Sequence, residues 1–218
     1  METLLLYADI TPLLNEENYA NAYRLVSKDR QERADRKKFM QNKAEEVAAE
    51  LLLIEGLRQI GREPEEISYT FGKNGKPYLK GMPDVYFNYS HAGGFVLCAI
   101  ADCEVGCDIE KIDVCKEDIS KRFFHPLEIK AIEEADDKQK AFTEIWTAKE
   151  SYLKAIGTGL QTQLNSFSCV FLKGDTARVN GWMVKRMQAM EGVAVSICIK
   201  EREQWQVYLK KHVIPDKF

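Results

Sequence analysis

The chain has 218 residues and a formal net charge of −3, and hydrophobic residues make up 45% of it. That share is enough for a packed core and excludes a disordered chain, while the near-neutral charge argues against a general nucleic-acid binder. No apolar run is long enough to span a membrane. The N-terminal apolar segment follows no basic stretch and is interrupted by Asp9, so we expect no signal peptide and a cytoplasmic protein.

Up to residue 110 the chain is predicted to contain a short strand, then two helices, then four strands. Apolar residues such as Val47, Leu51 and Ile54 recur at roughly helical spacing and indicate the second helix. The predicted elements are a strand at 3–9, helices at 15–27 and 29–60, and strands at 67–71, 85–90, 95–101 and 104–110.

The second half is predicted to repeat this order of helices followed by strands. Pro126 suits the first turn of a helix, and Gly157 and Gly159 are expected to end a long one. The predicted elements are helices at 116–124, from 126 and at 138–156, and strands at 167–172, 182–187, 193–199 and 206–209. Such clustering predicts an α+β fold rather than an alternating α/β fold, with halves at residues 1–104 and 105–218.

Gly106-Cys-Asp-Ile-Glu110 is the first acidic motif. On a strand, Asp108 and Glu110 project from one face, because successive side chains alternate. Two neighbouring carboxylates repel unless a cation lies between them, and hard oxygen ligands select Mg²⁺ or Mn²⁺ over zinc. Short acidic pairs are also common on ordinary exposed strands, so the motif alone leaves both interpretations open.

Trp146-Thr-Ala-Lys-Glu-Ser-Tyr-Leu-Lys154 is the second motif. On a helix, Trp146, Glu150 and Lys154 lie one turn apart on the same face. A carboxylate flanked by lysines suits a metal–pyrophosphate complex, in which the carboxylate binds the cation and Lys149 and Lys154 bind phosphate oxygens. The alternative is an ordinary Glu–Lys pair on a helix surface.

Together the motifs resemble those of 4′-phosphopantetheinyl transferases of the surfactin-synthetase-activating type. The shared pattern is Gly-x-Asp-x-Glu, Phe124-x-x-x-Glu128 and Trp-x-x-Lys-Glu-Ser, preceded by Gly75-Lys-Pro-Tyr78 and Phe87-Asn-Tyr-Ser-His91. The resemblance implies two similar α+β halves related by a pseudo-twofold, with coenzyme A in the cleft between them. It also implies a monomer, because a chain of this length supplies both halves.

The resemblance assigns roles to the residues of the two acidic motifs. Asp108, Glu110 and Glu150 match the family's ligands for Mg²⁺. Lys149 and Lys154 match residues near the diphosphate of coenzyme A, where positive charge would meet phosphate oxygens.

Three upstream residues match the family's contacts to the nucleotide end of coenzyme A, including its 3′-phosphate: Lys76, Ser90 and His91. In the family, a basic residue on the first long helix often helps to hold the nucleotide. The corresponding segment here, 43–48, offers Lys43 but no arginine. The contacts from this helix therefore stay open.

The implied reaction is attack of a carrier-protein serine on the β-phosphate of coenzyme A, which releases 3′,5′-ADP. Mg²⁺ and Lys154 would stabilise the charge that builds on the pyrophosphate. Glu150, Glu128 or a metal-bound water would take the serine proton. Two other classes stay open: a metal-dependent phosphodiester hydrolase that uses the same carboxylates, and a non-catalytic module that binds coenzyme A or a carrier protein.

The segment between the two acidic motifs is a candidate docking surface for an acidic helix of the carrier protein. It offers basic and apolar side chains, namely Lys116, Lys121, Arg122, Ile119, Phe123 and Phe124. The alternative is that the two phenylalanines pack in the core and the basic residues are merely solvated.

Overall fold

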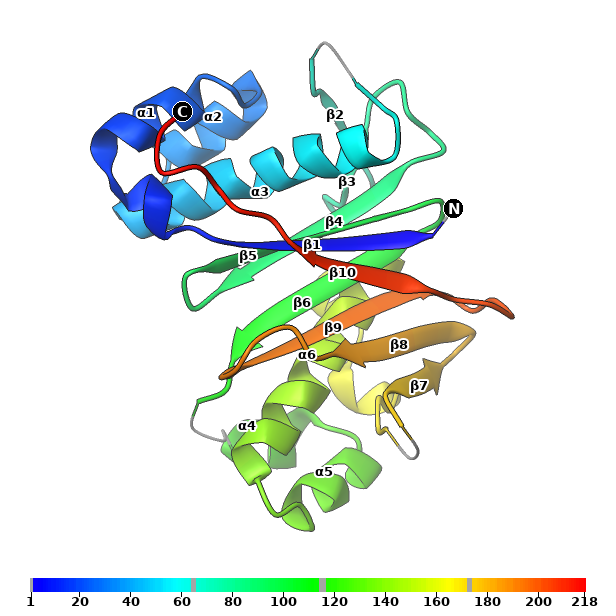
Figure 1. Cartoon of the computed structure of the whole chain (residues 1–218). Coiled ribbons are helices and arrows are strands. Elements are labelled where there is room, and N and C mark those ends of the chain that lie inside the picture. The colour runs from blue at the N-terminus through cyan, green and yellow to red at the C-terminus, as the bar shows by residue number, and fades with distance from the viewer. Residues whose placement is uncertain (1, 64–65, 114–116, 172–173) are drawn as a thin grey trace. The chain divides into compact units, whose positions relative to one another are not determined.

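The computed structural model describes residues 2–63, 66–113, 117–171 and 174–218, and Figure 1 shows their helices and strands. Contacts divide the chain into two compact units. Residues up to Asp102 form the first unit together with Gln206–Phe218, and Cys103–Trp205 form the second. Each unit contains a four-stranded sheet and helices, which confirms the predicted α+β class with two halves. No helix in the described ranges is both long and apolar enough to cross a bilayer.

The first unit is built on a sheet with the strand order β10-β1-β5-β4. β1 (Thr3–Asp9) pairs parallel with β10 (Val207–Lys211) and antiparallel with β5 (Phe95–Ala101), which pairs with β4 (Tyr86–Ala92). The last strand thus belongs to the first unit, whereas the sequence predicts 105–218 as one half. The reason is strand pairing: the second edge of β1 carries backbone groups that need partners, and β10 supplies them.

Helices and a small hairpin complete the first unit. They are η1 (Thr11–Leu14), α1 (Glu16–Tyr23), α2 (Lys28–Asp35), α3 (Met40–Gln59), β2 (Tyr69–Phe71) and β3 (Pro77–Leu79). The long helix α3 packs on the sheet, since its Leu52, Leu53 and Leu57 are buried in one cluster with Leu6 and Ile100 of the strands. Burial of this apolar surface stabilises the unit.

The helix predicted over 29–60 is two helices, α2 and α3, with a break between residues 35 and 40. In one continuous helix, residues 30 and 46 would be about 24 Å apart along the axis. Here Nη1 of Arg30 lies 2.5 Å from Oε2 of Glu46, and its Nε lies 3.4 Å from Oε2 of Glu50. The chain turns back so that a buried guanidinium meets two carboxylates, and this contact is invisible to local periodicity.

The second unit is built on a fully antiparallel sheet with the strand order β6-β9-β8-β7. Its elements are β6 (Val105–Lys111), α4 (Glu117–Phe123), α5 (Pro126–Glu133), α6 (Lys138–Ile156), η2 (Gly159–Gln161), η3 (Leu164–Ser166), β7 (Thr176–Val179), β8 (Trp182–Met187) and β9 (Val193–Lys200). α6 has its predicted bounds, because both ends are capped locally. Asp137 accepts a hydrogen bond from the Lys140 amide, and Gly157 adopts a left-handed φ of 68°.

The segment predicted as a strand at 167–172 is irregular in its described residues, 167–171. Its backbone groups have other partners. The carbonyl of Phe167 accepts a hydrogen bond from Lys149 at 2.9 Å, and the amide of Cys169 donates to Glu128 at 2.7 Å. The strand prediction was wrong. The apolar residues of this segment are buried beside α6, but its described residues do not pair with a strand of the sheet. β7, in turn, has no counterpart among the predicted strands.

Gly106 of the first acidic motif allows α6 to lie directly on β6. A Cβ at this position would overlap the backbone oxygen of Ser151 and the backbone nitrogen of Ala155. Both are main-chain atoms of α6, so neither can rotate away as a side chain could. The glycine of the motif is therefore a packing requirement that sets the separation of helix and strand.

We predict that Gly106→Ala destabilises the protein by at least about 1–3 kcal/mol, the usual cost of overpacking, because α6 must move away from β6. Urea unfolding would measure the loss. Gly72→Ala is the control, since its added methyl meets only the ring of Tyr78 within 3.4 Å. Equal stability of the two variants would contradict the packing role of Gly106.

Candidate active site

Asp108 and Glu110 lie on β6 on the face that α6 covers. Side chains two apart in a strand share a face. Asp108 pairs across the sheet with Ser196 of β9, whose hydroxyl lies 3.0 Å from that of Thr147 on α6. Asp108 therefore lies on the face of the sheet that α6 covers. Glu110, two residues further along the strand, lies on the same face, as the sequence predicts.

Lys154 of α6 forms an ion pair with Asp108. Its ammonium donates to Oδ1 of Asp108 at 2.6 Å, and the Asp108 side chain is 4% exposed. The other oxygen, Oδ2, is buried and receives no hydrogen bond from the described residues. Burial alone would lower the pKa of Lys154, but attraction to Asp108 and Glu150 outweighs it and raises the pKa above its usual value.

The three acidic residues act on one another electrostatically. Burial raises the pKa of Glu150, and repulsion from Asp108 and Glu110 raises it further, while Lys154 lowers it. The carboxylates are thus close enough for one to oppose the ionisation of another. A cation placed among them would remove this repulsion.

The predicted metal site fits a divalent cation in charge and donor type, since its ligands are carboxylate oxygens. As the side chains stand, no group of three or more His, Cys, Asp or Glu residues within the described ranges is arranged to hold a metal ion. The Lys154 ammonium supplies the positive charge that Asp108 contacts. The assignment of Asp108, Glu110 and Glu150 as ligands therefore stays a prediction.

Lys149 and Glu128 form an ion pair in the interior of the second unit. Both side chains are 0% exposed. The ammonium donates to Oε1 and Oε2 of Glu128 at 2.8 and 2.7 Å and to the carbonyl of Phe167 at 2.9 Å. Glu128 also accepts from the amides of His125 and Cys169 at 2.9 and 2.7 Å. Every strong hydrogen-bonding site of the lysine is used within the protein.

This placement differs from the roles that the family resemblance implies for the two residues. Lys149 is expected near the diphosphate of coenzyme A, and Glu128 is a candidate base. In the structure both are enclosed, and the Lys149 ammonium lies 5.5 Å from the ring centre of Phe124 and 4.1 Å from that of Phe167. Neither side chain reaches a ligand in this arrangement, because each is already held by the other.

The residues matched to the nucleotide end belong to the first unit. His91 lies near the end of β4, 42% exposed, with Nδ1 3.1 Å from Oε2 of Glu45 on α3. Ser90 is largely buried and points to the opposite face of β4, since it precedes His91 in a strand. Lys76 is also largely buried, in the turn before β3. Sequence reasoning missed Glu45, because no local signal links it to His91.

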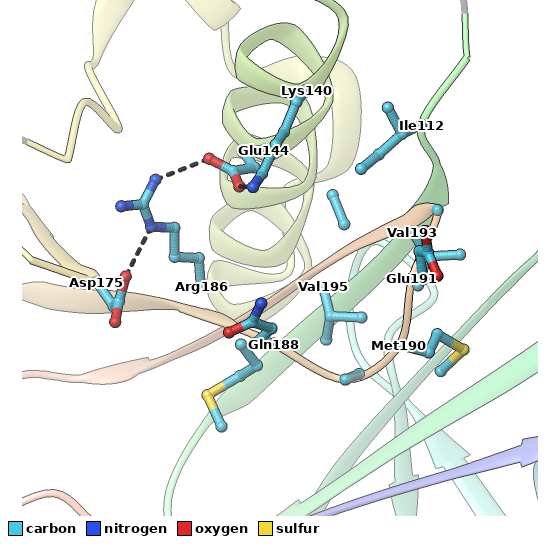
Figure 2. A pocket seen from close by; sticks show the side chains of 14 residues that line it. Ile112, Lys140, Glu144, Asp175, Arg186, Gln188, Met190, Glu191, Val193 and Val195 are labelled. Atoms are coloured by element: carbon cyan, nitrogen blue, oxygen red, sulfur yellow. Dashed lines mark hydrogen bonds and ion pairs between the residues drawn. The ribbon is translucent and has the colours of Figure 1, made fainter. Parts of the chain in front are cut away.

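Two of the pockets on the second unit bear on the candidate site. Glu110 lines one of about 300 Å³, together with Phe142, Trp146 and other residues near the end of β6. A second, of about 640 Å³, adjoins the loop between β8 and β9 and contains none of the predicted site residues. Figure 2 shows it: Arg186 lies between Glu144 and Asp175, at 2.7 and 2.8 Å.

Comparisons with known proteins place this geometry in a family context. A model described as "4'-phosphopantetheinyl transferase superfamily" matches residues 104–210. A second, described as "4'-phosphopantetheinyl transferase, N-terminal", matches residues 13–103. The two matches are consecutive and cover both predicted halves.

Individual relatives carry the same description. A 4'-phosphopantetheinyl transferase of Bacillus subtilis is 41% identical over 53% of this chain and 52% of its own length. The transferase gsp of Aneurinibacillus migulanus is 38% identical over 65% and 60%. The transferase Sfp of Bacillus subtilis (strain 168) is 31% identical over 72% and 71%. The matched part of the chain thus spans 52% to 71% of the length of these relatives.

A solved structure, the holo-[acyl-carrier-protein] synthase (AcpS) of Thermotoga maritima, matches 46% of this chain and 64% of that chain. Its TM-score is 0.38 and its sequence identity is 16%. A similarity this low supports no inference, so the family relationship rests on the sequence comparisons.

We predict that Lys149→Met destabilises the protein by about 3–5 kcal/mol, because it leaves the Glu128 carboxylate buried without its counter-ion. Adding Glu128→Gln should restore part of the loss, since the stranded charge is removed while an oxygen remains to accept hydrogen bonds. Urea unfolding of the single and double variants would show this coupling.

The control for this cycle is the exposed pair of Lys130 and Glu134, 3.8 Å apart. Lys130→Met should change the free energy of unfolding by no more than about 1 kcal/mol, as is usual for surface pairs. If Lys149→Met were as mild as Lys130→Met, the buried pair would not have the structural role described here.

Proposed function

Because the chain belongs to the 4′-phosphopantetheinyl transferase family, of the surfactin-synthetase-activating (Sfp) type, we propose that it transfers 4′-phosphopantetheine from coenzyme A to a serine of an apo carrier protein. The observation that carries the proposal is the acidic cluster on the face shared by β6 and α6. There Lys154 contacts Asp108 at 2.6 Å, and Asp108 and Glu110 are near enough to raise the pKa of Glu150. Carboxylates beside a lysine supply the types of group that a metal–pyrophosphate complex requires.

Asp108, Glu110 and Glu150 would hold Mg²⁺, or Mn²⁺. When bound, the ion would neutralise charge on the diphosphate of coenzyme A. Lys154 stays protonated, since its pKa is raised, and it would donate to diphosphate oxygens as the leaving group departs. The ammonium of Lys154 would be free for this contact once it leaves Asp108.

In the transfer step the serine oxygen attacks the β-phosphorus, a new O–P bond forms, and the bond to the bridging oxygen breaks to release 3′,5′-ADP. The serine proton must go to a base within hydrogen-bond reach. Glu128 is wholly enclosed by its ion pair, whereas Glu150 is only partly buried. Of the two side chains, Glu150 is therefore the better candidate for the base.

The nucleotide end of coenzyme A would contact the first unit. Of the three matched residues, His91 is the exposed one, and an imidazole donor suits the 3′-phosphate. Lys76 and Ser90 are largely buried, so we assign them a smaller part in this contact. With both halves supplied by one chain, we propose a monomer.

The carrier protein would dock on α4 and the start of α5. Phe123 is 43% exposed, with the guanidinium of Arg122 5.2 Å from its ring centre, and Leu127 and Lys121 are also exposed. Phe124 instead is buried and stacks on Phe142 at 5.5 Å. Lys116, the third basic residue of the predicted surface, lies outside the described residues. An exposed aromatic ring among basic side chains complements an acidic amphipathic helix.

We predict that Asp108→Ala lowers transfer about a hundredfold or more, because charge stabilisation by a bound metal is worth several kcal/mol. Intact-mass spectrometry of an apo carrier protein with coenzyme A and Mg²⁺ would measure it. The variant relieves repulsion on Glu150 but leaves Lys154 without its carboxylate partner, so circular dichroism of the variant must show a native fold before the loss is assigned to the metal site.

Asp175→Asn, at the pocket beside the loop between β8 and β9, is the control and should transfer like the wild type. The same assay separates the rival functions. Phosphopantetheine released without a carrier adduct would indicate a hydrolase, and no reaction at all would indicate a binding module. Full turnover in excess EDTA would refute the metal site.

For the docking surface, we predict that Lys121→Glu combined with Arg122→Glu raises the KM for an acidic carrier protein about tenfold, with the KM for coenzyme A nearly unchanged. Complementary exposed charges act mainly on association, so the carrier KM of the wild type should also rise with salt. Steady-state kinetics with each substrate varied would show both effects.

The matched control is a double reversal at exposed basic residues elsewhere in the second unit, Arg178→Glu with Lys200→Glu. It should leave the carrier KM close to that of the wild type. If both double variants had the same carrier KM, docking on α4 would be excluded.

A further inference from the structure

Glu45 is a buried carboxylate on α3 that contacts the exposed imidazole of His91. Its side chain is 4% exposed, and its Oε2 lies 3.1 Å from Nδ1 of His91. Two amides of the same helix also donate to it: Nε2 of Gln41 to Oε1 at 3.2 Å, and Nδ2 of Asn42 to Oε2 at 3.3 Å. The carboxylate is therefore held in one orientation before any ligand binds.

This contact determines how the His91 ring is presented. A carboxylate can only accept a hydrogen bond, so this 3.1 Å ion-pair contact favours a proton on Nδ1 of His91. Which ring nitrogen carries a proton is set by the bond that the other makes. With Nδ1 directed at Glu45, Nε2 lies on the far side of the ring, and the 42% exposure of His91 leaves that side accessible.

We propose that Glu45 is a positioning residue for the nucleotide: by holding Nδ1 of His91, it aims Nε2 at the 3′-phosphate and thereby sets the preference for nucleotides that carry this group. The inference rests on the proposed function, because it takes the 3′-phosphate as the partner of His91. Outer partners of this kind orient the group that touches the ligand without touching the ligand themselves.

A purely structural role makes a different prediction. If Glu45 only anchored α3 to β4, removing it would lower stability and leave nucleotide preference unchanged. If Glu45 positions His91, removing Glu45 must lower the preference for nucleotides with a 3′-phosphate. This loss must disappear when His91 is also removed.

The test compares binding of 3′,5′-ADP and 5′-AMP, which differ only in the 3′-phosphate, by isothermal titration calorimetry. The wild type should favour 3′,5′-ADP, and Glu45→Ala should reduce that preference about threefold to tenfold, the equivalent of one hydrogen bond. Glu45→Gln should keep most of it, since its amide oxygen still accepts from Nδ1. The double variant with Glu45→Ala and His91→Ala should lose no more of this preference than His91→Ala alone.

The control variant is Glu55→Ala, which removes a carboxylate from the same helix, bonded to Gln59 and not to His91. Its preference should equal that of the wild type. Ring ¹⁵N spectra give a second measurement, tractable because the chain has three histidines. Glu45→Ala should shift the Nδ1 signal of His91, whereas Glu55→Ala should not.

The positioning role would be overturned if Glu45→Ala kept the wild-type preference for 3′,5′-ADP while His91→Ala reduced it. That result would leave the proposed function intact. An unmodified carrier protein in the wild-type transfer assay would instead reject the proposed function. The two failures are therefore distinguishable.

Discussion

The buried ion pair of Glu128 and Lys149 is the constraint on which the acidic cluster of the second unit depends. It joins α5, α6 and the irregular segment at 167–169 by hydrogen bonds of 2.7–2.9 Å. Lys149 precedes Glu150, and consecutive helical residues differ in direction by about 100°. Holding Lys149 inward therefore sets the rotation of α6, so that Glu150 and Lys154, which share one face, are turned toward β6.

The separation of α6 from β6 is set by a second constraint, the absence of a side chain at Gly106. With the rotation and the separation of the helix both defined, the ammonium of Lys154 reaches Asp108 at 2.6 Å. The family's motifs therefore combine two kinds of residue. Gly106 and Lys149 shape the fold around the candidate site, while Asp108 and its acidic neighbours are the residues that we propose for the chemistry.

Two glutamates of α3 in the first unit, Glu45 and Glu50, have buried carboxylates. Each contacts a side chain from another element. Burying a carboxylate is costly unless it is paired and hydrogen-bonded. Glu50 accepts from Arg30 and from the hydroxyl of Tyr69 at 2.6 Å, and Oε2 of Glu45 lies 3.1 Å from Nδ1 of His91. The need to pair buried carboxylates thus explains two features. It brings α2 back against α3, where one continuous helix was predicted, and it places His91, the candidate nucleotide contact, against α3.

The sequence by itself determined the features that arise within a few residues or from residue type. These include the bounds of α6, which its own caps define, the shared face of Asp108 and Glu110, and membership of the family. Tertiary structure alone decided that Lys149 and Glu128 are enclosed, that Phe124 is buried while Phe123 is exposed, and that β10 returns to β1. The physical reason is range: caps and periodicity act over one or two turns, whereas the burial of a charge or a strand edge depends on partners far away in the chain.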